Sequence, residues 1–107
     1  MEQASPVCCE GLPLIAIDLG ARFHLGRILI TANAEATLAA EDWAAALRRH
    51  GRGDWGELCA DDAKQNERAL LDGGRLVSVY HGRNCVKFHI ITEFDRNVTA
   101  VLLPEDY

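Results

Sequence analysis

The residues best suited to chemistry in this sequence are two histidines and a lysine in its C-terminal third, where His81 and His89 flank Lys87. Histidine titrates near neutral pH and can act as a general acid or base, while lysine can bind a phosphate group. One hypothesis is therefore a small nuclease or toxin in which His81 and His89 exchange protons and Lys87 or Arg96 holds the phosphate. The alternative, which is common for histidines on exposed strands, is that these side chains only solvate a surface.

The sequence lacks the motifs of the common enzyme classes. It contains no Gly-rich phosphate loop followed by Lys-Ser or Lys-Thr, no nucleophile elbow, no His-Glu-x-x-His helix and no Cys-x-x-Cys pair. Cys8 and Cys9 are adjacent, which suits one metal ion poorly, and neither Cys59 nor Cys85 has a Cys or His at ligand spacing. We therefore expect free thiols, with Cys59 and Cys85 partly buried, and neither a metal ion nor a cofactor.

Two turn-like segments carry residue types that favour binding over catalysis. Asp54 and Trp55 lie between glycines, and Glu93, Asp95 and Arg96 lie in a second polar turn. Trp and Arg are enriched in binding hot spots, and loops often carry function. Trp55 is either a hydrophobic plug of the core or a contact residue, and Arg96 either braces Asp54 or Glu93 or contacts a partner. The pattern favours the internal role for both and leaves the contact role open.

Hydrophobic periodicity predicts which elements position these residues. Residues 1–11 lack periodicity and are predicted to form a flexible arm, while residues 12–107 are predicted to form a single α+β domain. The expected elements are a short strand from Leu14 to Asp18, a strand from Phe23 to Thr31, a helical segment capped by Asn33 that ends at His50 with a break near Ala39 to Asp42, a helix from Asp61 or Asp62 to Asp72, and strands from Arg75 to His81, Cys85 to Glu93 and Val98 to Leu103. Short turns make the last three strands an antiparallel meander packed on the helices.

Alternation along the central strand of the meander predicts its two faces. Phe88, Ile90 and Thr92 should face the helices, while Lys87 and His89 should lie on the other, half-polar face. In the first strand, Gly26 indicates a bulge or a close approach of two backbones. Trp43 should be buried on the inner side of its helix.

Composition limits the classes of partner. The chain has 107 residues and a net charge of −5, which argues against nucleic acid as a direct ligand because such proteins need Lys and Arg to neutralise phosphates. No apolar run reaches the roughly 20 residues that a membrane helix needs. Glu2 stands where a signal peptide would carry positive charge. We therefore expect a cytoplasmic protein without a membrane association.

Five stretches resemble a known group of proteins: Phe23 to Ala32, Gly53 to Leu58, Asn66 to Leu70, Ile90 to Arg96 and Leu102 to Tyr107. They are similar to small, largely uncharacterised proteins of bacterial plasmids and integrative elements, some of which are labelled type I restriction-enzyme methylation subunits. The likeness covers about residues 23–107. This chain differs from the family pattern at Asn33 and Ala34, where a Pro-Gly is common. It also differs at His89, which weakens a catalytic role for that residue. The resemblance implies a mobile-element setting and no particular activity.

Together these features lead to one expected function and one rival. The expected function is that of a non-enzymatic accessory protein of a mobile genetic element, which binds another protein and inhibits a host defence system such as restriction or CRISPR. Asp54, Trp55, Glu93, Asp95 and Arg96 are the candidate binding residues. A homodimer is compatible with the sequence. The rival is the nuclease or toxin with His81, His89 and Lys87.

Overall fold

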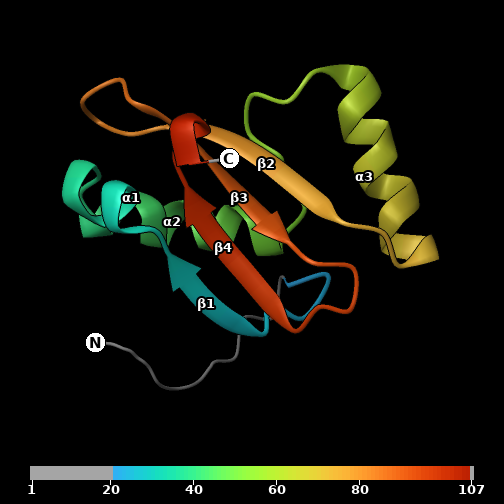
Figure 1. Cartoon of the computed structure of the whole chain (residues 1–107). Helices are drawn as coiled ribbons and strands as arrows, with labels where there is room; N and C mark the ends of the chain where they lie inside the picture. Colours follow the sequence, from blue (N-terminus) through green and yellow to red (C-terminus); the bar gives the residue numbers. More distant parts are fainter. Residues whose placement is uncertain (1–20, 107) are drawn as a thin grey trace.

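The computed structural model describes residues 21–106, so the predicted arm and the predicted strand from Leu14 to Asp18 lie outside the described residues. In chain order the elements are β1 (Arg27–Ile30), α1 (Ala32–Thr37), α2 (Ala40–Gly51), α3 (Ala60–Asp72), β2 (Leu76–His81), β3 (Lys87–Thr92), β4 (Val98–Leu102) and the short 3₁₀-helix η2 (Pro104–Asp106). This arrangement, shown in Figure 1, confirms the predicted α+β class.

The four described strands form one mixed sheet in the order β1-β4-β3-β2. β2 pairs antiparallel with β3, and β3 pairs antiparallel with β4, as the short connections between them predict. β1 pairs parallel with β4 and forms the other edge of the sheet (Figure 1). The sequence pattern assigns β1 no neighbour, because its pairing joins residues about 70 positions apart across all three helices.

β1 is shorter than the predicted strand from Phe23 to Thr31, and Gly26 explains where it begins. Gly26 has a φ of +69°, which interrupts the extended backbone just before Arg27. A Cβ atom at this position would lie 2.4 Å from the backbone carbonyl group of Asn97. The predicted close approach of two backbones is therefore confirmed, and it allows β1 to meet the start of β4.

The helices show one correction and two confirmations. The first helix is capped by Thr31 and not by Asn33, because the Thr31 side chain accepts a hydrogen bond from the backbone N–H of Ala34. The chain breaks between α1 and α2, where Leu38 adopts an extended backbone and is only 5% exposed. α3 ends at Asp72 as predicted, although it begins at Ala60, and Gly73 caps it in a left-handed conformation. No helix in residues 21–106 is long and apolar enough to cross a membrane.

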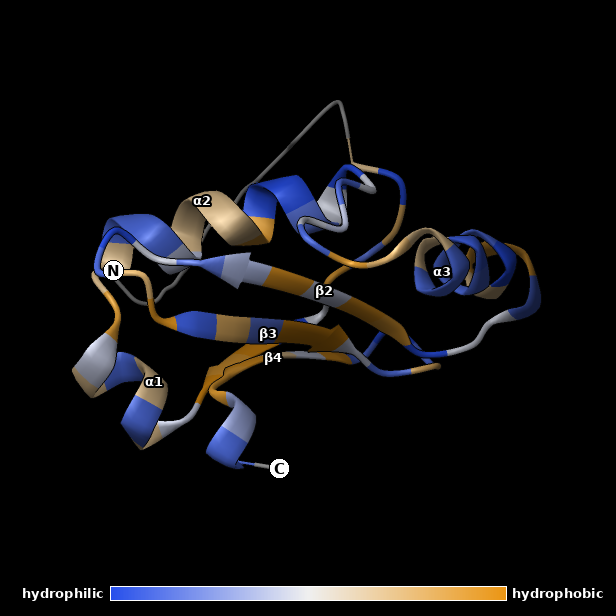
Figure 2. Cartoon of the chain, turned by 90° about the horizontal axis from the view of Figure 1, so that it is seen from above, coloured by the Kyte–Doolittle hydropathy of each residue, from blue (hydrophilic) through white to orange (hydrophobic). Residues whose placement is uncertain are grey.

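Most of the larger core cluster lies between α2 and the face of the sheet that α2 covers. Figure 2 shows α2 along one side of the sheet and α3 beside the β2 edge. Phe88, Ile90 and Thr92 of β3 are buried toward the helices as predicted. The larger buried cluster joins α1, α2 and the sheet, and a smaller one joins Trp55 with α3 and β2. Trp43 is less buried than expected, because it packs against the edge of the larger cluster.

Candidate functional site

Trp55 lies inside the molecule. Its side chain is 6% exposed, and its indole N–H donates a hydrogen bond to the Glu67 carboxylate at 3.0 Å. The indole stacks against the ring of Phe23, with ring centroids 6.2 Å apart. Asp54 forms an ion pair with Arg49 at 2.8 Å, and this guanidinium holds the pKa of the Asp54 carboxyl below its usual range. Trp55 is thus placed as a plug between α2, α3 and β2.

The glycine after Trp55 lets this segment pair with the edge of β2. Gly56 has a φ of +71°, and a Cβ atom there would lie 2.0 Å from the carbonyl oxygen of Val79. The backbone N–H of Glu57 donates to that carbonyl oxygen, and the N–H of Val79 donates to the carbonyl oxygen of Trp55. Only glycine permits this close approach, which explains why the tryptophan is followed by one.

Arg96 holds the β3–β4 connection against the end of α3. Its guanidinium donates to the carbonyl oxygens of Gly74 at 2.6 Å, Ala69 at 3.0 Å and Glu93 at 3.1 Å. Carbonyls at the C-terminal end of a helix carry partial negative charge, which favours a cation. Arg96 therefore has an internal bracing role, but with carbonyl groups and not with the carboxylates of Asp54 or Glu93 that the sequence suggested. The Glu93 carboxylate instead lies 3.5 Å from the Arg75 guanidinium.

Phe23 links the two predicted turns. The Arg96 guanidinium lies 5.8 Å from the centroid of the Phe23 ring, and the same ring contacts the rings of Trp55 and His50. Asp54, Trp55 and Arg96 are therefore brought into one connected region of the structure, although mainly by internal contacts. Phe23 was predicted only as a strand residue, because nothing in its local pattern indicates this bridging position.

Two large apolar side chains are exposed on the two segments that Arg96 joins. Phe94, in the β3–β4 connection, is 66% exposed, and Leu71, in the turn of α3 that Arg96 contacts, is 89% exposed. Figure 1 shows the C-terminal end of α3 and the β3–β4 connection at the same side of the molecule. We call Leu71, Glu93, Phe94 and Asp95 the turn surface.

The backbone of the turn surface is fixed by several hydrogen bonds. The Arg96 N–H donates to the Glu93 carbonyl oxygen, and both the backbone and side-chain N–H groups of Asn97 donate to the Asp95 carboxylate. Arg96 itself has a φ of +59°, a conformation that non-glycine residues adopt rarely and only where their surroundings hold them. Sequence reasoning missed Phe94 and Leu71. Two signals in the sequence could have indicated them: Phe94 is a phenylalanine inside a polar turn, and Leu71 is a leucine outside the apolar face of its helix.

The histidines of the rival hypothesis lie on one face of the sheet, the one that α2 does not cover. His81 pairs with Lys87 across the β2–β3 ladder, and His89 lies two residues farther along the same face. The Nδ1 atom of His81 lies 2.6 Å from the Glu57 carboxylate. Burial, with a smaller contribution from the charge of Lys87, lowers the pKa of His89. The structure thus brings His81, Lys87 and His89 together as the alternation predicted.

A buried histidine that sequence reasoning missed lies at the centre of the core. His50 is fully buried, and its ring nitrogens contact the hydroxyl groups of Ser78 and Thr92. The Thr99 hydroxyl donates to the Leu25 carbonyl oxygen, so it must accept from Thr92, and Thr92 must in turn accept from His50. This chain of donors assigns the proton to Nε2 and makes Nδ1 the acceptor from Ser78. Burial, reinforced by the charge of Arg96, lowers the pKa of His50 to about 3.

A local signal for this histidine was present. Ala46, Leu47 and His50 follow helical spacing, so His50 belongs to the inner face of α2. The hydroxyl groups that contact His50 belong to Ser78 of β2 and Thr92 of β3, so their proximity to the ring depends on how α2 packs on the sheet.

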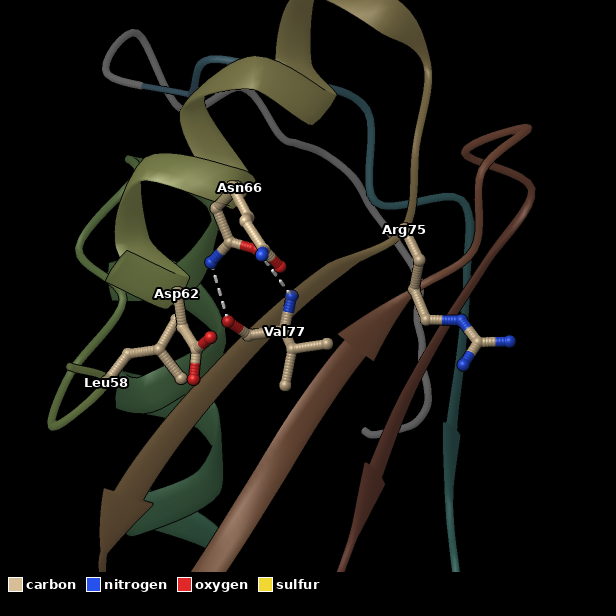
Figure 3. A pocket seen from close by; sticks show the side chains of 6 residues that line it. Leu58, Asp62, Asn66, Arg75 and Val77 are labelled. Carbon is tan, nitrogen blue, oxygen red and sulfur yellow. Dashed lines mark hydrogen bonds between the residues drawn. The ribbon is translucent and has the colours of Figure 1, made fainter. Parts of the chain in front are cut away.

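A pocket of about 280 Å³ lies between α3 and β2 and is lined by Leu58, Asp62, Gln65, Asn66, Arg75 and Val77. Asn66 donates from its side-chain amide to the Val77 carbonyl oxygen at 2.7 Å and accepts from the Val77 N–H at 3.2 Å (Figure 3). Arg75 points away from Asp62 and Asn66 in the same view. The polar groups of this pocket therefore hold α3 on the sheet and do not converge on a common point.

Comparison of the chain with protein-family models, curated proteins and solved structures finds no match.

The structure also places the residue types that could bind a metal ion or react as thiols. Within residues 21–106, no group of three or more His, Cys, Asp or Glu side chains is placed to hold a metal ion. Cys59 and Cys85 are free and exposed, which corrects the expectation that they are partly buried. Cys59 immediately precedes α3 and Cys85 lies in the β2–β3 turn with a φ of +64°, positions set by turns and not by the core. Cys8 and Cys9 lie outside the described residues.

Proposed function

We propose that this protein acts by binding another protein through the turn surface. The observation that carries the proposal is Phe94, a large aromatic side chain that is 66% exposed on a turn whose backbone Arg96 holds in place. A soluble domain gains nothing in its own stability from an exposed phenylalanine, whereas aromatic side chains dominate the energetics of interfaces. Leu71 adds a second exposed apolar side chain, in the last turn of α3 that Arg96 holds to the β3–β4 connection.

Preorganisation makes this surface efficient for binding. Association costs free energy whenever loops and side chains must be ordered at the interface. In the turn surface the ordering cost of the backbone is met during folding, by the Arg96 contacts and the Asp95–Asn97 hydrogen bonds. Burial of Phe94 in a partner then contributes mostly to affinity.

The charge of the surface indicates the chemistry of the partner. Glu93 and Asp95 flank Phe94, and the whole chain carries a net charge of −5. Such a surface repels nucleic acid and fits a protein with an apolar pocket bordered by Lys or Arg. The resemblance to proteins of plasmids and integrative elements suggests a host defence complex, of the restriction or CRISPR type, as that partner. In this role the protein is a non-enzymatic inhibitor carried by a mobile element.

Substitution of Phe94 tests the proposal. We expect Phe94→Ser to weaken partner binding by at least about 30-fold, the effect of losing a hot-spot side chain, while the midpoint of thermal unfolding stays unchanged because the ring is exposed. Binding is measured by pull-down with the tagged protein from host lysate in which restriction or CRISPR complexes are expressed. Leu71→Ser should weaken binding less.

Lys64→Ser is the matched control, because Lys64 is also exposed on α3 but in its N-terminal half. Recovery of no stoichiometric partner, or equal recovery by wild type and Phe94→Ser, counts against the proposal.

A second candidate function rests on the shared face of His81, Lys87 and His89. This grouping supports the nuclease or toxin hypothesis because a general acid, a general base and a phosphate-binding cation would lie side by side. If the hypothesis holds, strong expression in a heterologous bacterium should arrest growth and degrade RNA or DNA, and His89→Gln should restore growth. Normal growth with intact nucleic acid removes this candidate.

A further inference from the structure

The two edge strands of the sheet, β2 and β1, differ in whether their outward-facing backbone groups have hydrogen-bond partners among the described residues. At the β2 edge, the outward-facing backbone groups of Val77 bond to the Asn66 side chain, and those of Val79 bond to the backbone of Trp55 and Glu57. This edge is therefore closed to any further strand. Closing it uses a buried amide and a tight glycine turn, so the closure is built into the fold.

The β1 edge has no such cover within residues 21–106. The N–H groups of Arg27 and Thr31 donate to the carbonyl oxygens of Asn97 and Val101 on the β4 side. Because backbone groups alternate along a strand, those of Ile28 and Ile30 face outward, and no described residue pairs with them. Ile28 and Leu29 are 40% and 42% exposed. Among the described residues, β1 thus combines an unpaired hydrogen-bonding edge with exposed apolar side chains on both faces.

We propose that β1 pairs antiparallel with β1 of a second copy of this chain, about a two-fold axis at Leu29. In this register Ile28 of each copy lies opposite Ile30 of the other, and their outward N–H and C=O groups bond to each other. Leu29 lies opposite Leu29 as a non-hydrogen-bonded pair, in which side chains are closest. The two four-stranded sheets join into one, and Ile28 and Leu29 become covered.

Charge complementarity identifies a second copy as the occupant. The register places Arg27 of one copy opposite Thr31 of the other, at both ends of the pairing. Thr31 donates its hydroxyl hydrogen bond to the Asp106 carboxylate at 2.6 Å, and Asn33 donates to the same carboxylate. Each copy therefore offers an exposed cation at one end of β1 and an anion at the other end, a pattern that matches a second copy in the reversed direction.

Disulfide trapping tests both the dimer and its register. In the full chain with Cys8, Cys9, Cys59 and Cys85 replaced by serine, Leu29→Cys should form a disulfide-linked dimer under mild oxidation, since the two thiols meet at the axis. Ile28→Cys is the matched control and should form several-fold less, because Ile28 faces Ile30. Trapping of Leu29→Cys at no more than the Ile28→Cys level overturns the proposed register.

Sedimentation of the wild-type chain provides an independent measurement. We expect a concentration-dependent dimer that weakens as salt is raised, and Arg27→Glu should weaken it about tenfold or more. Arg48→Glu, an exposed charge change on α2, should leave it intact. A wild-type chain that stays monomeric at high concentration overturns the proposal. If the Ile28 and Ile30 amides of that monomer are protected from hydrogen exchange, the edge is covered by another part of the same chain.

Discussion

Arg96→Ala is expected to lower the free energy of unfolding by about 2–3 kcal/mol, because the carbonyl oxygens of Ala69, Gly74 and Glu93 lose their shared donor. The contact of the guanidinium with the Phe23 ring is lost as well. The measurement is urea unfolding at neutral pH. The turn surface should loosen in the same variant, so partner binding should weaken together with stability.

Two further variants test whether the loss of stability is specific to the guanidinium group of Arg96. Arg96→Lys keeps the cation, but one ammonium group cannot reach the carbonyls of α3 and of the turn with the same geometry, so most of the loss should remain. Arg48→Ala removes an exposed arginine from α2 and should change stability by less than about 0.5 kcal/mol. If Arg96→Ala keeps wild-type stability and still loses its partner, Arg96 is a contact residue and not a brace.

Acid should destabilise the protein through His50 well before its carboxylates titrate. The pKa of His50 is about 3 in the folded chain because the ring is buried, against about 6.5 when unfolded. Below pH 6.5 the unfolded chain therefore binds a proton that the folded chain does not, and the free energy of unfolding falls as pH falls. Between pH 6.5 and pH 4.5 the loss from this one group should be about 2 kcal/mol.

Comparison of variants isolates the contribution of His50. His50→Gln should be less stable than wild type at pH 7, by about 1–3 kcal/mol, because the hydroxyls of Ser78 and Thr92 lose a matched partner. Its further loss between pH 6.5 and pH 4.5 should be much smaller than that of wild type. His89→Gln is the matched control. The pKa of His89 is also lowered, but its ring is only partly buried, so this variant should keep most of the wild-type dependence of stability on pH. Parallel pH profiles of wild type and His50→Gln would falsify this assignment.

Carboxylates affect stability mainly at the acid end of this window. The pKa of Asp42 is lowered by hydrogen bonds from Arg83, and that of Glu67 by hydrogen bonds from Arg22 and Trp55. A lowered carboxyl pKa stabilises the folded chain above the unfolded value, which is 3.8 for Asp42 and 4.5 for Glu67, and this stabilisation is lost progressively as pH falls through that value. The effects of these groups are the same in wild type and in His50→Gln, so the difference between the two pH profiles still reports His50.

The sequence by itself determined the features that depend on neighbouring residues. The helix ending at Gly73, the antiparallel pairing of β2, β3 and β4, and the inward face of Phe88 and Ile90 all follow from local periodicity and short connections. It also placed His81, Lys87 and His89 on one face, because the alternation of side chains along a strand has a fixed period.

Only the tertiary structure decided which distant groups meet. The parallel pairing of β1 with β4, the carbonyl groups that Arg96 contacts and the hydroxyl groups around His50 all join residues far apart in the sequence. The same contacts left Phe94 and Leu71 exposed, although their residue types alone suggest burial. Periodicity reports the direction in which a side chain points from its own element. The atoms that it meets depend on how the elements pack, and that packing is set by the free energy of the whole core.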